Sequence, residues 1–176
     1  MIRELRTRVE LPGVLSLGSN LGDREATIRN AVREICAIPG VVVVKASGLV
    51  ETPALKPEGV DVNAPAYLNA VVAVRSALDP VALLAALNGI EHAHGRVRGI
   101  HWGDRTLDIY IVSLGAISSH SVELTLPHPR AAQRAFVLSP WLQIEPNATL
   151  PGLGRVDELL AATGDTATPY PAEPLL

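Results

Sequence analysis

The sequence has few of the residues that mark secreted, membrane or nucleic-acid-binding proteins. Its 176 residues include a single cysteine, Cys36, so no internal disulfide can form, which favours the cytoplasm. No apolar run is long enough to span a bilayer, and the first residues, MIRELRTRVELPG, lack the apolar segment of a secretory signal. A formal net charge of -3 and a pI of about 5.9 argue against a basic nucleic-acid or membrane surface. We expect a cytoplasmic protein with neither partner.

Aromatic residues are also scarce, at 3% of the chain, whereas 48% of the residues are hydrophobic. A chain of this length and composition can bury a real core, and it fits one domain of α/β or α+β type. Cys36 lies in an apolar helical pattern with Ile28, Val32 and Ile35, so we expect it to be a small core residue. Because aromatic residues are so few, those that fall in a candidate pocket are a mild sign of function.

Local patterns predict alternating strands and helices. The predicted strands are Val14–Asn20, Val41–Glu51, Tyr67–Ser76 and Arg105–Leu114. The predicted helices run from an N-cap at Asp23 to Pro39-Gly40, over Asp79–Gly95 with a buried stripe of Val81, Leu84, Leu87 and Ile90, and from about Ala131. Three prolines make Thr52–Ala66 a long loop, which suggests a functional or mobile segment.

The order strand, helix, strand, strand, helix, strand predicts an α+β, ferredoxin-like (βαββαβ) fold. Such a sheet is largely antiparallel, and we expect its helices on one face, the other face free for a site, and extra C-terminal elements. The predicted organisation is an N-terminal extension over residues 1–13 and one domain over 14–163. A proline-rich tail over 164–176 is expected to be poorly ordered.

The stretch RTLDIYIVSL contains the most informative polar residues. Side chains of a strand alternate between faces, so Leu107, Ile109 and Ile111 would enter the core while Asp108 and Tyr110 share the opposite face. Asp108 could be a magnesium ligand, because Mg²⁺ prefers anionic oxygens. A lone acid on a strand can equally be a surface residue or an arginine partner. Tyr110 is neutral near pH 7 and is a poor ligand for that ion.

Basic and polar residues around this strand could bind phosphates. Guanidinium groups offer paired donors to phosphate oxygens, although a solvated basic surface explains the same residues. On the preceding helix, two polar residues one turn apart could face a common site or simply be solvated. The residues concerned are Arg96, Arg98, Arg105, Arg134 and His128, with Asn88 and Glu91 on the helix.

A second group of residues suits a flat heterocycle. Tyr67 and Asn69 lie two apart in a strand and point the same way, so an aromatic ring and an amide edge would lie together. Core packing around a buried asparagine explains the same pattern. The group comprises Thr52, Pro53, Leu55, Tyr67, Asn69 and Phe136, and Trp102 in a glycine-flanked loop could be a plug or a lid.

Taken in order, several segments resemble the 6-hydroxymethyl-7,8-dihydropterin pyrophosphokinase family of folate biosynthesis. The resemblance extends from about Val14 to Gly152, and its segments are LSLGSNLGDR, ETPAL, YLNAVV, IEHAHGRVR, WGDRTLDIYI, LTLPHPRAAQRAFVL and PWLQIEP. It implies a ferredoxin-like fold, a pterin-like small-molecule substrate, and Mg²⁺ and ATP as cofactors. The implied reaction transfers a pyrophosphoryl group from ATP to the hydroxymethyl oxygen of the pterin and releases AMP.

The resemblance also implies roles for individual residues. The implied pterin pocket is Thr52, Pro53, Leu55, Tyr67, Asn69 and Phe136, with the pterin stacked between Tyr67 and Phe136. The implied surroundings of ATP are Asn88, Glu91, Arg96, Arg98, Trp102, Arg105, Ile111, Thr125, His128 and Arg134. The catalytic set is expected to be Arg96, His101, Arg105, Asp108 and Tyr110, with Asp108 as the metal ligand.

Four departures from the family pattern lie on the nucleotide and metal side. Tyr110 stands where the resemblance implies a second metal-binding aspartate. Asp104 replaces a proline, His101 an arginine and Asn88 a glutamine. Loss of one carboxylate removes a full negative charge from a site whose catalysis depends on electrostatic clamping. Asp104 could compensate only if its loop folded inward.

These departures leave three hypotheses for function. The first is a pyrophosphokinase with an altered, weaker metal site. The second is a repurposed enzyme that binds another flat or bicyclic molecule and needs neither metal nor ATP, with Tyr110, Asp108, His101 or Asp104 as acid or base. The third is a non-catalytic ligand-binding protein, since fold alone does not fix function.

Overall fold

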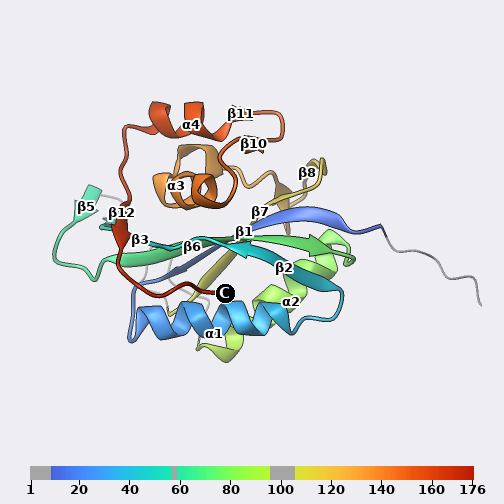
Figure 1. Cartoon of the computed structure of the whole chain (residues 1–176), viewed down its shortest axis with the longest axis horizontal. Coiled ribbons are helices and arrows are strands. Elements are labelled where there is room, and N and C mark those ends of the chain that lie inside the picture. The colour runs from blue at the N-terminus through green and yellow to red at the C-terminus, as the bar shows by residue number, and fades with distance from the viewer. Residues whose placement is uncertain (1–8, 57–58, 96–105) are drawn as a thin grey trace, which may run out of the picture.

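The protein is built around one six-stranded antiparallel sheet, seen in a computed structural model that describes residues 9–56, 59–95 and 106–176. The strands β12, β3, β6, β1 and β7 follow one another, and β2 also pairs with β6 (Figure 1). The strands of this sheet are β1 (Leu11–Ser19), β2 (Val41–Ala46), β3 (Leu49–Thr52), β6 (Tyr67–Ser76), β7 (Asp108–Leu114) and β12 (Thr168–Tyr170). The helices are α1 (Arg24–Cys36), α2 (Pro80–Ala93), α3 (Ala135–Ile144) and α4 (Val156–Thr163).

Three short hairpins and one turn of 3₁₀ helix connect these elements. The hairpins are β4 (Ala54–Lys56) with β5 (Gly59–Asp61), β8 (Ser119–His120) with β9 (Thr125–Leu126), and β10 (Thr149–Leu150) with β11 (Gly154–Arg155). The 3₁₀ turn is η1 (Ala131–Gln133). The predicted helix from about Ala131 is therefore two pieces, η1 and then α3.

The strand order confirms the predicted α+β, ferredoxin-like fold. Strand β6 lies between β1 and the β2 and β3 strands and is antiparallel to each of them. Strand β7 pairs with the other side of β1 and forms an edge of the sheet. This is the split βαβ arrangement that the order of the elements predicted.

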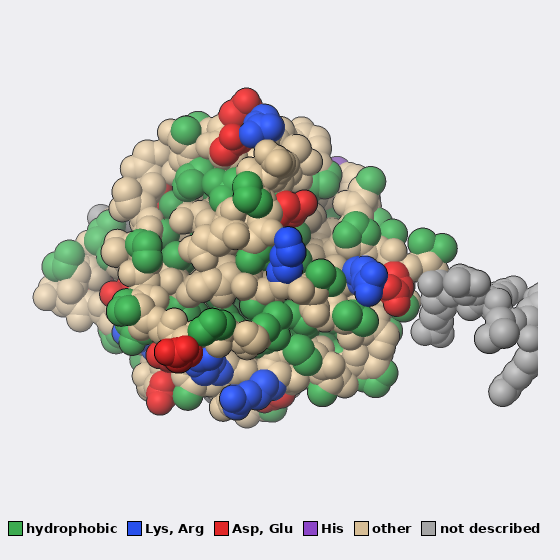
Figure 2. Space-filling view, viewed as in Figure 1, with side chains coloured by type: hydrophobic (Ala, Val, Ile, Leu, Met, Phe, Trp, Pro, Cys, Tyr) green, Lys and Arg blue, Asp and Glu red, His purple; other side chains and the backbone are tan. Residues whose placement is uncertain are grey.

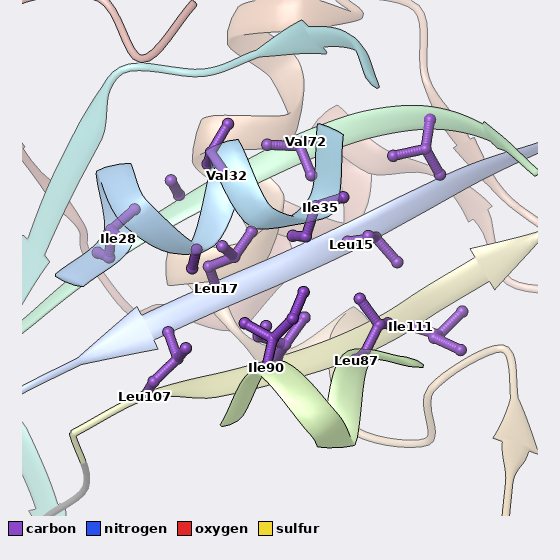
Figure 3. Packing of buried hydrophobic residues seen from close by; sticks show 14 of the residues in the cluster. Leu15, Leu17, Ile28, Val32, Ile35, Val72, Leu87, Ile90, Leu107 and Ile111 are labelled. Carbon is purple, nitrogen blue, oxygen red and sulfur yellow. The ribbon is translucent and has the colours of Figure 1, made fainter. Parts of the chain in front are cut away.

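One face of the sheet packs against α1 and α2. Alternate side chains of β1, such as Leu15 and Leu17, meet Ile28 of α1 and Leu87 of α2 in one continuous cluster (Figure 3). Leu107, Ile109 and Ile111 belong to the same cluster, as the alternation in RTLDIYIVSL predicted. Asp108 and Tyr110 therefore lie on the other face.

The second face is partly covered, although we expected helices on one face only. Val71 of β6 and Val112 of β7 pack against Leu138 and Trp141 of α3 and Val156 of α4. Figure 1 shows α3 and α4 above the sheet and α1 and α2 below it. The reason is that α3 carries its own apolar stripe, which must be buried. The site can therefore occupy only the part of this face that α3 leaves uncovered.

Both helices α1 and α2 begin where the sequence predicted, but two residues that were predicted to be buried are exposed. The side chains of Asp23 and Asp79 each accept a hydrogen bond from the backbone N–H three residues later, Ala26 N at 3.0 Å and Ala82 N at 2.9 Å. Cys36, however, is exposed at the end of α1. Val81 is 58% exposed. Both lie in a terminal turn, where the apolar stripe has already rotated away from the sheet.

The predicted strand Val41–Glu51 is divided into β2 and β3. The break falls at Ser47, whose backbone N–H donates to Val71 O and whose hydroxyl accepts from Val71 N, each at 2.9 Å. Both parts still pair with β6. The predicted loop Thr52–Ala66 contains the small β4–β5 hairpin, which does not join the main sheet.

Part of the proline-rich tail is ordered, contrary to expectation. Residues Thr168–Tyr170 form β12, which pairs with β3 at the edge of the sheet. Proline is tolerated on an edge strand because its missing N–H can face away from the ladder. Tyr170 and Leu175 also pack against the hydrophobic cluster between the sheet and helices α1 and α2. The high proline content of the tail gave no indication of this packing.

Charged side chains of both signs are interspersed on the face of the molecule seen in Figure 2. Among the charged residues of the protein are the exposed pairs of Arg155 with Asp157 and Arg75 with Glu10. Within the part of the chain that the structure describes, no helix is both long and apolar enough to cross a membrane.

Candidate functional site

A polar row crosses three strands of the sheet at one end. Gly18 of β1 pairs with Asn69 of β6 on one side and with Asp108 of β7 on the other. Residues directly opposite each other in neighbouring strands share a face, so Asn69 and Asp108 flank Gly18 on the second face. Both side chains are buried, at 3% and 7% exposure. A few buried polar groups that converge on one place are typical of a ligand site, which favours a binding role for this row.

Gly18 is required by close packing. A Cβ at this position would lie 2.7 Å from Asn69 Oδ1, closer than side-chain atoms approach one another. The carboxamide of Asn69 therefore lies over the backbone of β1. The local pattern here, a glycine and two polar residues at the end of an apolar strand, predicts only a turn. The need for glycine at position 18 arises only because β1 pairs with β6 and β7 in a register that places Gly18 beside Asn69 and Asp108.

The predicted heterocycle residues come together at the β3–β6 end of this row. Asn69 Nδ2 donates a 3.2 Å hydrogen bond to Thr52 Oγ1 in the interior. Thr52 also pairs directly with Tyr67, so these three side chains share one face. The structure places Pro53 next to them, exposed, whereas the side chain of Leu55 lies outside the described residues. The sequence predicted that Tyr67 and Asn69 point to the same side of one strand, but it did not predict the hydrogen bond between Asn69 and Thr52.

Phe136 reaches this face from the start of α3. It is partly buried against the hydrophobic cluster that includes Val71 of β6 and Leu138 of α3. The guanidinium carbon of Arg134 lies 5.6 Å from the centroid of the Phe136 ring, within cation–π range. The start of α3 therefore brings together a predicted heterocycle residue and a predicted nucleotide residue.

A pocket adjoins the outer edge of β7. Its cavity volume is ≈ 270 Å³. The lining residues are Leu84 and Asn88 of α2, Ile109, Tyr110 and Ile111 of β7, and Glu123, Leu124, Thr125, His128 and Pro129 of the segment around β9. Five predicted site residues, Asn88, Tyr110, Ile111, Thr125 and His128, thus line one cavity. Sequence reasoning missed Glu123, which lies in a short hairpin with no pattern of its own.

Tyr110 and His128 form the aromatic wall of this pocket. Their ring centroids lie 5.0 Å apart in an edge-to-face arrangement. The backbone N–H of His128 donates to Val112 O at 2.8 Å, which fixes the residue against β7. Its Nδ1 accepts from Arg130 N at 3.3 Å. In the neutral ring the proton is therefore on Nε2, which can donate to an anionic ligand.

Burial lowers the pKa of His128 below its usual value of 6.5, and the Arg130 and Arg134 guanidinium groups lower it further. In the unfolded chain this pKa is normal, so on acidification the unfolded state takes up the proton first. The contribution to stability is full above about pH 6.5 and is lost as the pH falls toward the folded-state pKa.

We expect His128→Gln to unfold with a weaker pH dependence than the natural protein over that range. Chemical denaturation at a series of pH values from neutral to acidic measures the difference. His120→Gln, which alters an exposed histidine, is the control and should retain the natural slope. Identical slopes in all three proteins would show that His128 is not held neutral by the fold.

Glu91 connects α2 to the edge strand. It is 1% exposed, and its Oε1 accepts a 2.7 Å hydrogen bond from Ile109 N of β7. An edge strand leaves such N–H groups unpaired unless a side chain binds them. Glu91, predicted to surround the nucleotide, thus also holds β7 in place between Asp108 and Tyr110.

Six predicted site residues lie outside the described residues. They are Arg96, Arg98, His101, Trp102 and Arg105, together with Asp104 of the same segment. Their predicted roles stay predictions. The described part of the site consists of the polar row, the Thr52–Tyr67 end and the pocket beside β7.

The structure is an α+β protein with a ferredoxin-like sheet, and its candidate site combines the Asn69–Gly18–Asp108 row with the pocket beside β7. Sequence comparison agrees with this class, because residues 14–146 match the family described as 7,8-dihydro-6-hydroxymethylpterin-pyrophosphokinase (HPPK). The chain belongs to this family. The prediction of a pterin pyrophosphokinase of folate biosynthesis, a transferase, is thereby confirmed.

Individual relatives support the same assignment. The chain is 44% identical over 162 residues to the 2-amino-4-hydroxy-6-hydroxymethyldihydropteridine pyrophosphokinase of Mycobacterium leprae (strain TN), covering 84% of this chain and 81% of the relative. It is 40% identical over 138 residues to the protein of the same name from Methylorubrum extorquens (strain AM1), covering 78% and 85%. The repurposed-enzyme and non-catalytic hypotheses gain no support from these comparisons.

A solved structure shares the fold. The crystal structure of the Plasmodium falciparum HPPK-DHPS triple mutant with SDX-DHP superposes with a TM-score of 0.67 at 15% identity. The superposition covers 89% of this chain but 45% of that one, so this chain spans less than half of the Plasmodium protein. At this identity the likeness concerns the fold.

Proposed function

We propose that the protein transfers the pyrophosphoryl group of ATP to the hydroxymethyl group of 6-hydroxymethyl-7,8-dihydropterin. In this reaction the hydroxymethyl oxygen attacks the β-phosphorus of ATP, and the bond from that phosphorus to the α,β-bridging oxygen breaks. AMP leaves with that oxygen, and the hydroxyl proton is released. The observation that carries the proposal is the row Asn69–Gly18–Asp108, which runs from the heterocycle end of the sheet to the pocket beside β7.

The heterocycle end has the chemistry that a pterin requires. The ring of Tyr67 and the ring of Phe136 offer stacking surfaces from β6 and α3. The Asn69 carboxamide, held by Thr52, offers a donor and an acceptor to the edge of a flat ring. Gly18 leaves room beside that carboxamide, since any side chain there would collide with it.

The pocket beside β7 suits a nucleotide. Its walls are apolar where Leu84 and Ile111 line it and polar where Asn88, Thr125 and His128 do. His128 is held neutral with its proton on Nε2, so it donates a hydrogen bond to phosphate without adding charge. Arg134, at the start of α3, supplies a permanent positive charge close to His128.

Asp108 fits a magnesium ion that is carried in with ATP. Within the described ranges no three His, Cys, Asp or Glu side chains cluster as a complete metal site. Magnesium commonly binds one or two carboxylates together with substrate phosphates, which a single buried aspartate satisfies. The bound ion would supply positive charge to the phosphoryl group that is transferred. Asp108 would hold that ion between Asn69 and the pocket beside β7.

The test is pterin-dependent formation of AMP from ATP and Mg²⁺ by the purified protein. AMP that appears only when 6-hydroxymethyl-7,8-dihydropterin is present supports the proposal. No AMP under conditions in which both ligands bind by calorimetry would reject it and favour a binding protein.

Tyr110→Asp is expected to lower the Mg²⁺ concentration needed for half-maximal AMP formation by roughly tenfold. The new carboxylate would share the face of Asp108, and one added charge near a dication is worth at least ~1.4 kcal/mol. A magnesium titration of the initial rate measures the change. Tyr110→Phe, which retains the ring against His128 but adds no charge, is the control and should keep the natural requirement. An unchanged requirement in Tyr110→Asp would show that this position does not face the metal.

A further inference from the structure

The guanidinium group of Arg24 joins both ends of the segment that follows β3. Its Nη1 donates to Glu51 Oε1 at 2.8 Å and to the carbonyl oxygen of Ala66 at 2.7 Å. Glu51 is in β3 and Ala66 directly precedes β6. Arg24 is therefore bonded to the chain near both ends of the connection between these two strands. Arg24 is about three-quarters buried, with 25% of its side chain exposed.

These two attachment points adjoin the heterocycle subsite. Glu51 precedes Thr52, Ala66 precedes Tyr67, and Thr52 and Tyr67 are paired across β3 and β6. Because side chains alternate along a strand, Glu51 lies on the α1 face of the sheet while Thr52 lies on the ligand face. Arg24 therefore lies on the opposite side of the sheet from Thr52 and contacts this region only through Glu51 and the backbone of Ala66.

A second side chain from the same connection reinforces this attachment. Asn20 is 1% exposed, and its Nδ2 donates to the carbonyl oxygen of Pro65 at 3.3 Å. Two successive carbonyls, of Pro65 and Ala66, thus accept from Asn20 in the β1–α1 connection and from Arg24 at the start of α1. Asp23 caps α1 through Ala26 N, which fixes the backbone of Arg24 at the first position of the helix.

Within the described part of this segment Ala54 is buried, but residues 59–64 are exposed or half-buried. Val60 and Val62 are 56% and 81% exposed, and the β4–β5 hairpin stays apart from the main sheet. Asp61 Oδ1 accepts from Asn63 N and Ala64 N, bonds that shape the turn locally without anchoring it to the domain. Segments with few buried contacts open at low free-energy cost, so attachment at the ends determines their position.

We propose that Arg24 is a positioning residue of the heterocycle subsite, which sets the spacing of Thr52 and Tyr67 by holding Glu51 and Ala66 together. This inference rests on the proposed function for the identity of the ligand. Arg24 contributes to binding of the heterocycle and not to binding of the nucleotide, because β6 and β1 separate β3 from β7, the strand that lines the pocket.

The test compares Arg24→Met, Arg24→Lys and the control Arg29→Met. Methionine retains apolar bulk without donors, and we expect it to raise the KM for the pterin roughly tenfold, as loss of charge-assisted hydrogen bonds predicts. The KM for ATP should change less than about twofold. Both bonds of Arg24 come from one nitrogen, so the lysine ammonium can replace them and should restore most of the affinity.

Arg29 is a matched control because it lies on the same helix and also makes several bonds. Its guanidinium binds Glu25 Oε1 and the carbonyl oxygens of Glu173 and Pro174, away from residues 53–66. Arg29→Met should leave both KM values unchanged, even where it lowers the melting temperature. A loss of stability alone would therefore not reproduce the effect expected for Arg24→Met.

Hydrogen exchange of peptides covering residues 59–66 gives a readout that does not depend on activity. We expect faster exchange in Arg24→Met and natural exchange in Arg29→Met. If AMP is formed but the KM for the pterin is unchanged in Arg24→Met, the positioning role is rejected while the proposed function stands. If no AMP is formed by the natural protein, the proposed function fails, and unchanged exchange in Arg24→Met would reject the role of Arg24 separately.

Discussion

Replacing Asp108 by asparagine is expected to lower the rate of AMP formation by at least about a hundredfold, a loss of roughly 3 kcal/mol of transition-state stabilisation. Asparagine has nearly the same size, so the change removes the charge and little else. The carboxylate is buried between Gly18 and the pocket beside β7, where charge interactions are stronger than in water. Electrostatic stabilisation is the main catalytic contribution that a protein makes to phosphoryl transfer.

Initial rates of AMP release, with thermal unfolding as a check on folding, measure this prediction. The control is Asp165→Asn, which removes an exposed carboxylate after α4 and should be as active as the natural protein. If Asp108→Asn retains a rate within about tenfold of the natural one, the charge at this position is not needed, and Asp108 is not the metal ligand.

Gly18→Ala is expected to damage both the fold and the heterocycle subsite. The added methyl group would lie 2.7 Å from Asn69 Oδ1, so the carboxamide must move away from its position on Thr52. Overpacking of this kind lowers the free energy of unfolding by about 1–3 kcal/mol. Because Asn69 is the predicted reader of the pterin edge, we also expect the dissociation constant of the pterin to rise by roughly tenfold or more.

Denaturant unfolding and a fluorescence titration with the pterin measure these two effects. Gly89→Ala is the matched control, because Gly89 lies in α2 and an added methyl there meets no atom within 4 Å apart from its chain neighbours and the backbone of its own helix. It should raise the free energy of unfolding by up to about 1 kcal/mol and leave pterin binding unchanged. Natural affinity in Gly18→Ala would mean that Asn69 does not read the ligand from its present position.

Local features of the fold could be predicted from the sequence because they have local causes. The bounds of β6, Tyr67–Ser76, were predicted, and the aspartate caps of α1 and α2 determine where both helices begin. Features that depend on distant partners could not be predicted. The break at Ser47 follows from bonds to Val71 in another strand, and β12 exists because β3 has a free edge.

The candidate site divides in the same way. Alternation along a strand is enough to place Asp108 with Tyr110 and Tyr67 with Asn69, because each pair belongs to one strand. The Thr52–Asn69 hydrogen bond, the role of Gly18 and the double attachment made by Arg24 arise from strand register and helix placement. No pattern within one segment carries that information, because each contact joins residues from different elements.

The most direct test of the proposed reaction is the mass of the pterin product, measured together with the nucleotide that is released. The natural protein would be incubated with ATP, Mg²⁺ and 6-hydroxymethyl-7,8-dihydropterin, and the mixture separated and analysed by mass spectrometry. Transfer of a pyrophosphoryl group predicts a pterin that has gained two phosphoryl units, with one AMP formed per product. A pterin that gained one phosphoryl unit, with ADP as the second product, would contradict the account, as would an unmodified pterin.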